Sequence, residues 1–276
     1  MMTRKFTNLL MITGISSAIL FSCNKMVDIS DDQLISEDHV IAEQNSEEIN
    51  SVSDMEDVTD NLNSLKTDDA ANILSKDVKV EKDKSKNKST IDFGDGFLAK
   101  NGKSFEGKII KITNGKKYYE SGYSVSITYE NFSINKNKIS GTKIIENIGL
   151  NALGQMSWTI TVDHQITKAN GKRVSYYATR TRTQIEGAAT KELFIDDKFS
   201  ITGNGKGMAS NGMTFEMKIT KPIILDMSCR QRTSGIIDYT RSGKDTRTKS
   251  LDYGEGTCDD LATLTINGQT KTISLK

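Results

Sequence analysis

Residues 158–166 read Trp-Thr-Ile-Thr-Val-Asp-His-Gln-Ile, in which large apolar and polar side chains alternate. Trp158, Ile160, Val162 and Ile166 fall on one side of an extended chain, because successive side chains of a strand point to opposite faces. The polar residues between them fall on the other side, toward water. The stretch predicts a strand with one buried face, and an all-β, antiparallel fold built from strands of this kind.

The same alternation recurs along residues 91–276, for example at 123–129 and 215–219, and Asn-Gly pairs lie between such runs. Asn-Gly provides the two positive φ angles of a type I′ hairpin turn, so neighbouring strands should pair with each other. We predict one β domain over 91–276 with about ten or eleven strands. Its architecture is a large antiparallel meander, either a sandwich or an open, curled, barrel-like sheet. The Asn-Gly pairs lie at 114–115, 170–171, 204–205, 211–212 and 267–268.

The domain begins and ends with one pattern, Ile-Asp-Phe-Gly-Asp-Gly at 91–96 and Leu-Asp-Tyr-Gly-Glu-Gly at 251–256. The repeat predicts two equivalent corners between a strand and a turn. Each corner holds a candidate carboxylate pair, Asp92 with Asp95 and Asp252 with Glu255. Two carboxylates suffice for a glycosidase, and the same oxygens are weak candidates for a metal ion. Acids beside glycines also commonly cap the N–H groups of turns, and all three interpretations stay open here.

The first residues have the parts of a secretory signal, with Arg4 and Lys5 before an apolar stretch at 9–21. The stretch is too short for a permanent membrane span, which needs about 20 apolar residues. It ends in Leu-Phe-Ser-Cys at 20–23, which resembles the lipobox of bacterial lipoproteins. The resemblance implies that residues 1–22 are a lipoprotein signal peptide and that Cys23 carries the lipid anchor.

Residues 23–90 separate the predicted anchor from the β domain, and their composition is that of a charged tether. Residues 28–69 hold fourteen acids and one base, whereas residues 91–276 hold 27 Lys and Arg against 19 Asp and Glu. With no aromatic residue, the tether is expected to be mostly disordered. A short helix near 47–66 is the exception, because Ile49 and Val52 begin an apolar face of helical spacing. That helix either docks on the domain or a partner, or forms only transiently in water.

Cys229 and Cys258 remain as a pair once Cys23 is assigned to lipid, and an exported protein is expected to bridge them in a disulfide. The chain has two histidines, His39 in the tether and His164 in mid-strand. A Ser-His-Asp or Cys-His arrangement is therefore not expected. With so few cysteines and histidines, neither a zinc site nor any other cofactor is expected.

A basic strand face is the remaining candidate site. Arg180 and Arg182 are two residues apart and project together with Tyr176, and Arg230 with Arg232 repeats the spacing. Guanidinium groups in such a row bind carboxylates, phosphates or sulfates, and an aromatic ring stacks on a sugar. The alternative is an ordinary solvated sheet face. Gly203, Gly205 and Gly207 lack a following helix, so a bulge or tight hairpin is expected there rather than a dinucleotide loop.

The lipobox occurs together with several short segments of the domain: the first corner at 91–94, Phe-Glu-Gly-Lys-Ile-Ile at 105–110, Ile-Ser-Gly-Thr at 139–142, Thr-Arg-Thr-Arg at 179–182, Ile-Thr-Gly at 201–203 and Leu-Asp-Tyr-Gly-Glu-Gly-Thr-Cys-Asp at 251–259. As a set they resemble a group of uncharacterised lipoproteins from Bacteroidetes. The resemblance implies an envelope location and a meandering β architecture, and it implies no activity.

From these observations we expect a cell-envelope lipoprotein of the outer membrane, with its surface or periplasmic placement left open. We expect a non-enzymatic binding or scaffolding role, with the membrane as one partner through the anchor. An anionic glycan or an envelope protein is the expected second partner, and nucleic acid is not. The alternative is a carboxylate-dependent, carbohydrate-active hydrolase.

Overall fold

The computed structural model describes residues 29–61, 77–99, 102–190, 194–241 and 248–275. The predicted signal peptide, Cys23 and the tether segment 62–76 lie outside the described residues, as does the end of the helix expected near 47–66. What is described is one long helix, α1 (Ile29–Asn61), and one sheet of fourteen antiparallel strands. The predicted all-β antiparallel meander is confirmed, in its open, curled form.

The strands pair in chain order from β1 to β14, with β3 attached only to β4. β1 and β14 are therefore the two edges of an open sheet. Two 3-10 turns, η2 (Lys84–Lys86) and η3 (Phe194–Asp196), lie between strands. The strands are β1 (Lys79–Asp83), β2 (Lys88–Asp92), β3 (Phe97–Leu98), β4 (Ser104–Thr113), β5 (Ser124–Ile134), β6 (Asn137–Leu150), β7 (Met156–Thr167), β8 (Arg173–Glu186), β9 (Lys198–Met208), β10 (Thr214–Asp226), β11 (Gln231–Arg241), β12 (Thr248–Glu255), β13 (Leu261–Ile266) and β14 (Gln269–Ser274).

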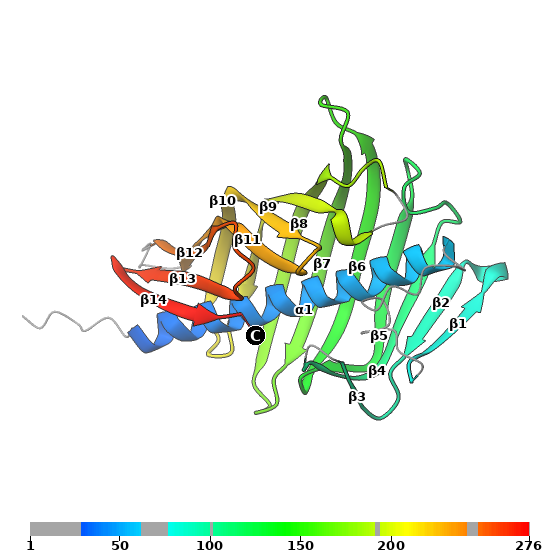
Figure 1. Cartoon of the computed structure of the whole chain (residues 1–276). Helices are drawn as coiled ribbons and strands as arrows, with labels where there is room; N and C mark the ends of the chain where they lie inside the picture. The colour runs from blue at the N-terminus through cyan, green and yellow to red at the C-terminus, as the bar shows by residue number, and fades with distance from the viewer. Residues whose placement is uncertain (1–28, 62–76, 100–101, 191–193, 242–247, 276) are drawn as a thin grey trace, which may run out of the picture.

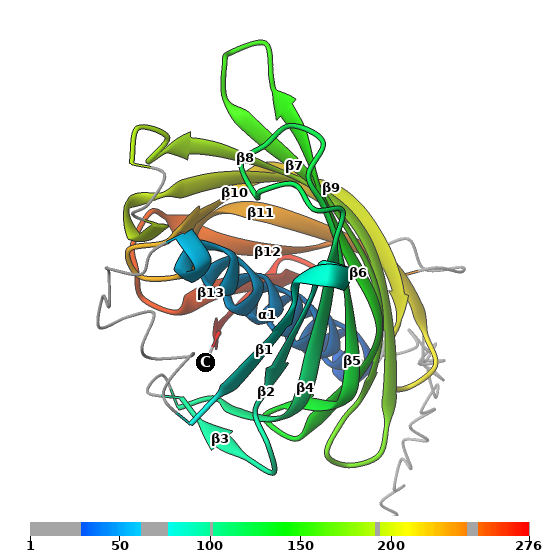
Figure 2. The same cartoon turned by 90° about the vertical axis from the view of Figure 1, so that its right-hand side faces the viewer.

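The sheet is curved and α1 lies along its hollow side, where it crosses the strands (Figures 1 and 2). We call this hollow side the trough. The alternation read from 158–166 matches the arrangement, since Trp158, Ile160, Val162 and Ile166 are buried on the trough side. The outward side of the same strand carries threonine and other polar residues, as expected for an antiparallel sheet with one wet face. Within the described part of the chain, no helix has the length and hydropathy of a membrane span.

The segment expected to be a disordered tether differs most from the sequence prediction. α1 spans 33 residues, and β1 and β2 extend the sheet to the N-terminal side of residue 91. The helix forms although much of its buried surface is polar, because its acids find basic partners in the trough, as described below. A prediction that counts only apolar residues therefore underestimates how much of this helix is buried.

Four of the five Asn-Gly pairs lie between strands as predicted, but only Asn267-Gly268 has the two positive φ angles of the expected type I′ turn. Asn267-Gly268 forms a two-residue turn between β13 and β14 with φ of 53° and 78°. Asn204-Gly205 was expected to be a turn, but it lies inside β9. There Gly205 faces the trough, where an added Cβ would lie 2.4 Å from the Met217 Cε atom. Gly205 and Gly207 thus make room for Met217 and Phe215 of β10, whereas a Cβ at Gly203 would meet the β8 backbone at Thr179; none of the three forms a hairpin.

The two predicted corners are equivalent in structure. Asp92 Oδ1 accepts the Gly94 N–H at 2.9 Å, and Asp252 Oδ1 accepts the Gly254 N–H at 2.9 Å. The predicted disulfide is confirmed, with Cys229 and Cys258 bonded across the start of β11 and the loop after β12.

Candidate functional site: a cation-lined trough under an acidic helix

The trough side of β8 contains more basic residues than a sheet core normally does. Its buried positions alternate as Val174, Tyr176, Ala178, Arg180 and Arg182. The sequence placed Tyr176, Arg180 and Arg182 on one face, and the structure brings them together. That face is not the solvated surface considered as an alternative, because Arg180 is 6% exposed and Arg182 is 1% exposed.

Basic side chains from other strands extend this line across the sheet. They come from β4, β6 and β11. Like the two arginines of β8, each has a side chain that is at most 9% exposed. Unpaired buried charges are strongly unfavourable, so such a row needs partners of opposite sign. We call these five residues the cationic row: Lys111, Lys143, Arg180, Arg182 and Arg232.

Glu43 of α1 lies at the centre of the row. Its carboxylate accepts hydrogen bonds from Arg180 Nη2 and Tyr176 Oη, and Arg232 Nη2 lies 3.4 Å from its Oε2 atom. Arg232 also donates to the backbone oxygen of Glu43 at 3.1 Å. Burial by itself would raise the pKa of the Glu43 carboxyl, but Arg180 and Arg232 outweigh it and hold this pKa well below its usual value. Glu43 is therefore an ionised carboxylate held between two guanidinium groups.

Two further ion pairs hold the second half of α1. Arg182 Nη1 donates to Asp54 Oδ2 at 2.7 Å, and both side chains are 1% exposed. The Arg182 guanidinium carbon also lies 4.7 Å from the centre of the Phe199 ring, a cation–π contact. Lys111 Nζ donates to Glu56 Oε2 at 2.6 Å and to the Ser53 oxygen at 2.8 Å. Basic residues of β8 and β4 thus pair with acids of α1, as Arg180 and Arg232 do with Glu43.

The first half of α1 is bound by turns at one end of the sheet. Lys168, in the turn between β7 and β8, donates to Asp38 Oδ1 at 2.6 Å. The backbone N–H of Ser210, in the next turn along that end, donates to Asp38 Oδ2 at 2.7 Å. The side-chain amide of Asn211 donates a hydrogen bond to Asp31 Oδ1 at 3.1 Å. Acids spaced from one end of the helix to the other therefore contact the sheet.

Lys143 and His39 are buried between α1 and the sheet, and neither forms an ion pair within the described residues. Lys143 Nζ donates only to the oxygens of Ser46 among the described residues, at 2.5 Å to the carbonyl and 3.0 Å to the hydroxyl. Burial lowers its pKa to about 7. His39 of α1 lies among the rings of Tyr176, Phe215 and Tyr239, and burial lowers its pKa to about 4. Burial thus favours the neutral form of both groups.

The fit between α1 and the trough is incomplete. Several buried polar atoms there have no hydrogen-bond partner within the described residues, among them both ring nitrogens of His39, Asn50 Oδ1 and Arg180 Nη1. A void of about 20 Å³ also lies between the helix and the sheet, beside Asn50 and Arg180. Native interiors normally satisfy more than nine in ten such groups and leave few voids. The interface is thus polar, with buried groups that have no protein partner beside a void of the size of one water molecule.

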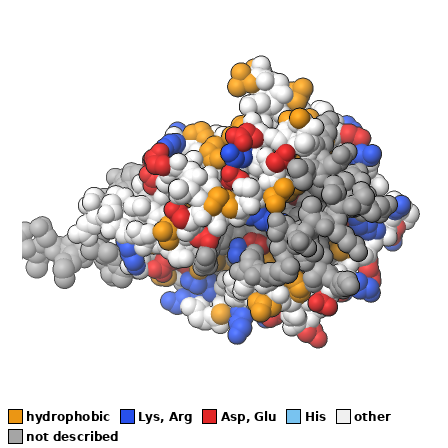
Figure 3. Space-filling model, viewed as in Figure 1, with side chains coloured by type: hydrophobic (Ala, Val, Ile, Leu, Met, Phe, Trp, Pro, Cys, Tyr) orange, Lys and Arg blue, Asp and Glu red, His pale blue; other side chains and the backbone are white. Residues whose placement is uncertain are grey.

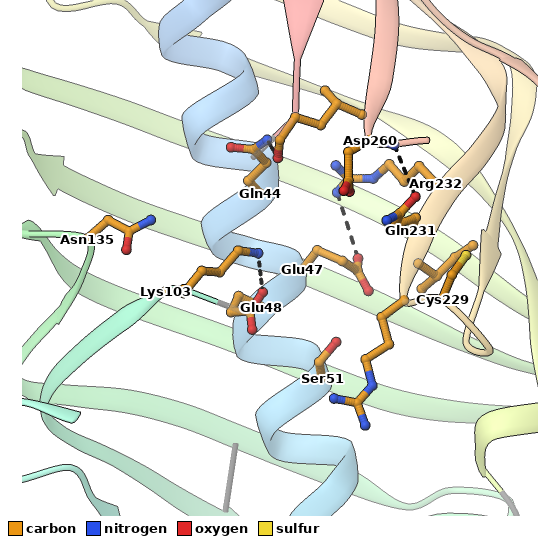
Figure 4. A pocket seen from close by; sticks show the side chains of 14 residues that line it. Gln44, Glu47, Glu48, Ser51, Lys103, Asn135, Cys229, Gln231, Arg232 and Asp260 are labelled. Carbon is orange, nitrogen blue, oxygen red and sulfur yellow. Dashed lines mark hydrogen bonds and ion pairs between the residues drawn. The ribbon is translucent and has the colours of Figure 1, made fainter. Parts of the chain in front are cut away.

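A pocket of about 470 Å³ opens along one flank of α1 (Figure 4). Glu47 and Glu48 of the helix line it, and each faces a cation: Glu48 bonds Lys103 at 2.5 Å, and Glu47 lies 3.9 Å from Arg232. Arg230, which was also predicted for the basic face, is half-buried and lines this pocket from the turn before β11 instead of lying in the trough. The helix residues that line the pocket are buried or half-buried.

The corner acids do not gather into a site. Asp92 and Asp252 cap turns as described above, and Asp95 is exposed, as is Glu255 with an 89% exposed side chain. Turn capping is thus the role that the geometry supports for Asp92 and Asp252, whereas Glu255 lies 3.8 Å from Lys221 Nζ. Within the described part of the chain, no cluster of three or more His, Cys, Asp or Glu side chains has the geometry to hold a metal ion.

Sequence reasoning found the cationic row in part and offered a docked helix near 47–66 as one alternative, but did not connect the two as a site and its occupant. The signal that points to the occupant is the charge contrast between an acidic segment at 28–69 and a basic domain at 91–276. Of the two alternatives left open for the helix near 47–66, the docked one is observed, since Ile49 and Val52 are fully buried. Comparison with protein-family models, curated proteins and solved structures finds no match to this chain.

Proposed function

We propose that this chain is a lipid-anchored protein of the bacterial cell envelope that binds an acidic helical segment of a partner protein in its trough. In this proposal α1 occupies the site until the partner replaces it. The role is binding, without catalysis, and the anchor is Cys23. The cationic row and its ion pairs with α1 carry the proposal.

The trough is suited to a helix rather than to a compact anion. Its cations contact carboxylates spread over α1 from Asp38 to Glu56, a length of about 27 Å at 1.5 Å per residue. Apolar side chains of α1 lie between them, since Ile35, Ile49 and Val52 are fully buried. A partner segment with acids and apolar residues at similar spacing would make both kinds of contact, which a glycan lacks.

The incomplete fit supports exchange of the occupant. Arg180 Nη1 and Arg182 Nε belong to the trough and have no hydrogen-bond partner among the described residues, so a partner segment that offers them an acceptor would bind more tightly, because an unmade buried hydrogen bond costs about 1–3 kcal/mol. The attached helix competes at a high effective concentration, of millimolar order for a short flexible link. Only a well-matched acidic helix would then replace it, which gives the site specificity.

The test uses a chain in which α1 is released by Glu43→Gln and Asp54→Asn together. A labelled peptide with the sequence of residues 29–61 should bind this chain, measured by fluorescence anisotropy, and should not bind the wild type. The same peptide carrying both substitutions is the matched control and should bind far more weakly. If the natural and substituted peptides bind equally, the ion pairs do not define the site. If a polysulfated polysaccharide displaces the peptide from the trough more readily than a second acidic helix does, an anionic glycan is favoured instead.

The anchor is tested separately. Labelled palmitate should enter the wild-type protein in cells and should be absent from Cys23→Ser. An inhibitor of lipoprotein signal peptidase should lead to accumulation of the precursor. Unchanged processing together with absent label would contradict an anchor at Cys23 and would leave the trough proposal unaffected.

A further inference from the structure

The hairpin between β6 and β7 projects beyond the rest of the sheet (Figures 1 and 2). Its side chains are apolar and strongly exposed: Ile148 is 56% exposed, Leu150 is 64% and Leu153, in the turn, is 81%. Figure 3 shows hydrophobic side chains at the top of this projection. No Asp, Glu, Lys, Arg or His occurs from residue 147 to residue 162, in a chain that is 26% charged. We call residues 148–155 the apolar tip.

The turn of the apolar tip satisfies its own polar groups. Asn151 Oδ1 accepts the N–H groups of both Leu153 and Gln155 at 2.9 Å. The Gly154 N–H donates to the Asn151 oxygen at 2.9 Å, and the Asn151 N–H donates to the Gln155 oxygen at 2.8 Å. The side-chain amide of Asn151 donates to Gln155 Oε1 at 3.1 Å. Internal hydrogen bonding of this kind lowers the cost of moving a turn out of water into lipid.

We infer that the apolar tip is a membrane-contacting element that inserts into the surface of a lipid bilayer. A projecting tip has no groove to accept a partner chain, so its apolar side chains are best buried by a medium that closes around them. Side chains of this type bury to a depth of about 5–10 Å at the boundary between headgroups and acyl chains. The contact adds to the proposed lipid anchor and does not involve the trough.

Basic residues beside the base of the tip suit a lipid headgroup layer. The loop between β4 and β5 packs on the end of β6, where Asn147 Nδ2 donates to the Tyr118 oxygen at 3.0 Å. Lys116 and Lys117 are exposed on that loop, which also exposes one acid, Glu120. Lysines near a bilayer surface attract anionic lipids. We therefore expect the tip to insert more readily when the bilayer contains anionic lipid.

The experiment places one environment-sensitive dye on the tip. Cys23 is acylated under the proposed function and Cys229 is bridged to Cys258, so Leu153→Cys introduces a unique free thiol. Lys172→Cys is the matched control, exposed in the turn at the opposite end of β7. The twelve residues of β7 separate the two positions by about 40 Å, too far for both to enter one bilayer surface. Each labelled protein is reconstituted with phosphatidylcholine vesicles, with and without phosphatidylglycerol.

We expect the emission of the dye at 153 to move to shorter wavelength on vesicles and to be quenched by nitroxide-labelled lipid. The dye at 172 should keep the emission that it has in water. Water-like emission at both positions would overturn the inference. So would a shift at 153 that follows protein concentration without lipid, because it would mean that the tip contacts protein. Dye uptake by the wild-type chain would show a free Cys23, and so would tell against the proposed anchor but not against the tip.

Discussion

Replacing Glu43 by Gln keeps the size of the side chain but removes the negative charge that Arg180 and Arg232 share. The side chains of both arginines are at most 9% exposed, so water cannot replace the lost carboxylate. Removing one partner of a buried ion pair costs about 3–5 kcal/mol. At 1.36 kcal/mol for each factor of ten, the equilibrium constant for release of α1 should rise by about two to four powers of ten.

Hydrogen exchange of the native protein, read by mass spectrometry, measures this release. In Glu43→Gln the amides of α1 should exchange faster by that factor, while those of β7 and β8 keep their protection. Glu37→Gln is the matched control, because Glu37 is an exposed carboxylate of the same helix that accepts a hydrogen bond from Gln33 at 2.7 Å. Glu37→Gln should change the free energy for release of α1 by no more than about 0.5 kcal/mol.

Two results would refute the reasoning. If the α1 amides exchange at the same rate in Glu43→Gln and in Glu37→Gln, the buried ion pairs contribute little to holding the helix. If β7 and β8 lose protection together with α1, then helix and sheet unfold as one unit, and α1 is not a separable occupant of the trough.

Three further predictions follow from the buried groups and the disulfide. The pKa of His39 is lowered from 6.5 to about 4, so binding of α1 is strongest above pH 6.5 and weakens as the pH falls toward 4, by about 2 kcal/mol at pH 5. Exchange of α1 amides at pH 5 and pH 8, corrected for intrinsic rates, should show this dependence in wild type, and His39→Phe should reduce it. Lys143→Met should stabilise the protein at pH 7 by about 2 kcal/mol, because Lys143 must otherwise be buried with a pKa lowered to about 7; a lower urea midpoint would contradict this. Replacing Cys229 and Cys258 by Ser opens a loop with a sequence separation of 29 and should lower the free energy of unfolding by about 3–4 kcal/mol, and an unchanged thermal midpoint would be the contrary result.

The sequence predicted the sheet well because the sheet follows local rules. Alternation at 158–166 sets which side of β7 is buried, and Asn267-Gly268 has the turn geometry that its residues favour. The turn Asn135-Lys136 between β5 and β6, with φ of 50° and 64°, escaped notice because lysine does not carry the same signal as glycine. Asn204-Gly205 carries the turn signal but is needed inside a strand, where glycine makes room for Met217. The need for glycine at this position comes from Met217 of the neighbouring strand, so the residues around Asn204-Gly205 do not reveal it.

The candidate site was only half predictable for a similar reason. The spacing of Tyr176, Arg180 and Arg182 places them on one face, which is a local property of β8. Whether that face is wet or covered depends on a helix more than a hundred residues earlier in the chain. Polarity was a misleading guide to burial for Glu43 and Asp54, since each is buried only because a basic residue of another element matches it. Buried ion pairs of this kind can be predicted only when the contact between the two elements is already known.

The order of the segments along the chain has a consequence for assembly. Glu43 comes 189 residues before Arg232, and even Glu56 comes 55 residues before Lys111, so α1 is synthesised long before its binding site exists. Hairpins between adjacent strands close short loops and form early, whereas contacts that join such distant residues carry a larger entropic cost and form late. We therefore expect α1 to take its place after the sheet has formed, so that the basic residues of the trough are uncovered until then. During that interval any acidic helix nearby can enter the vacant trough.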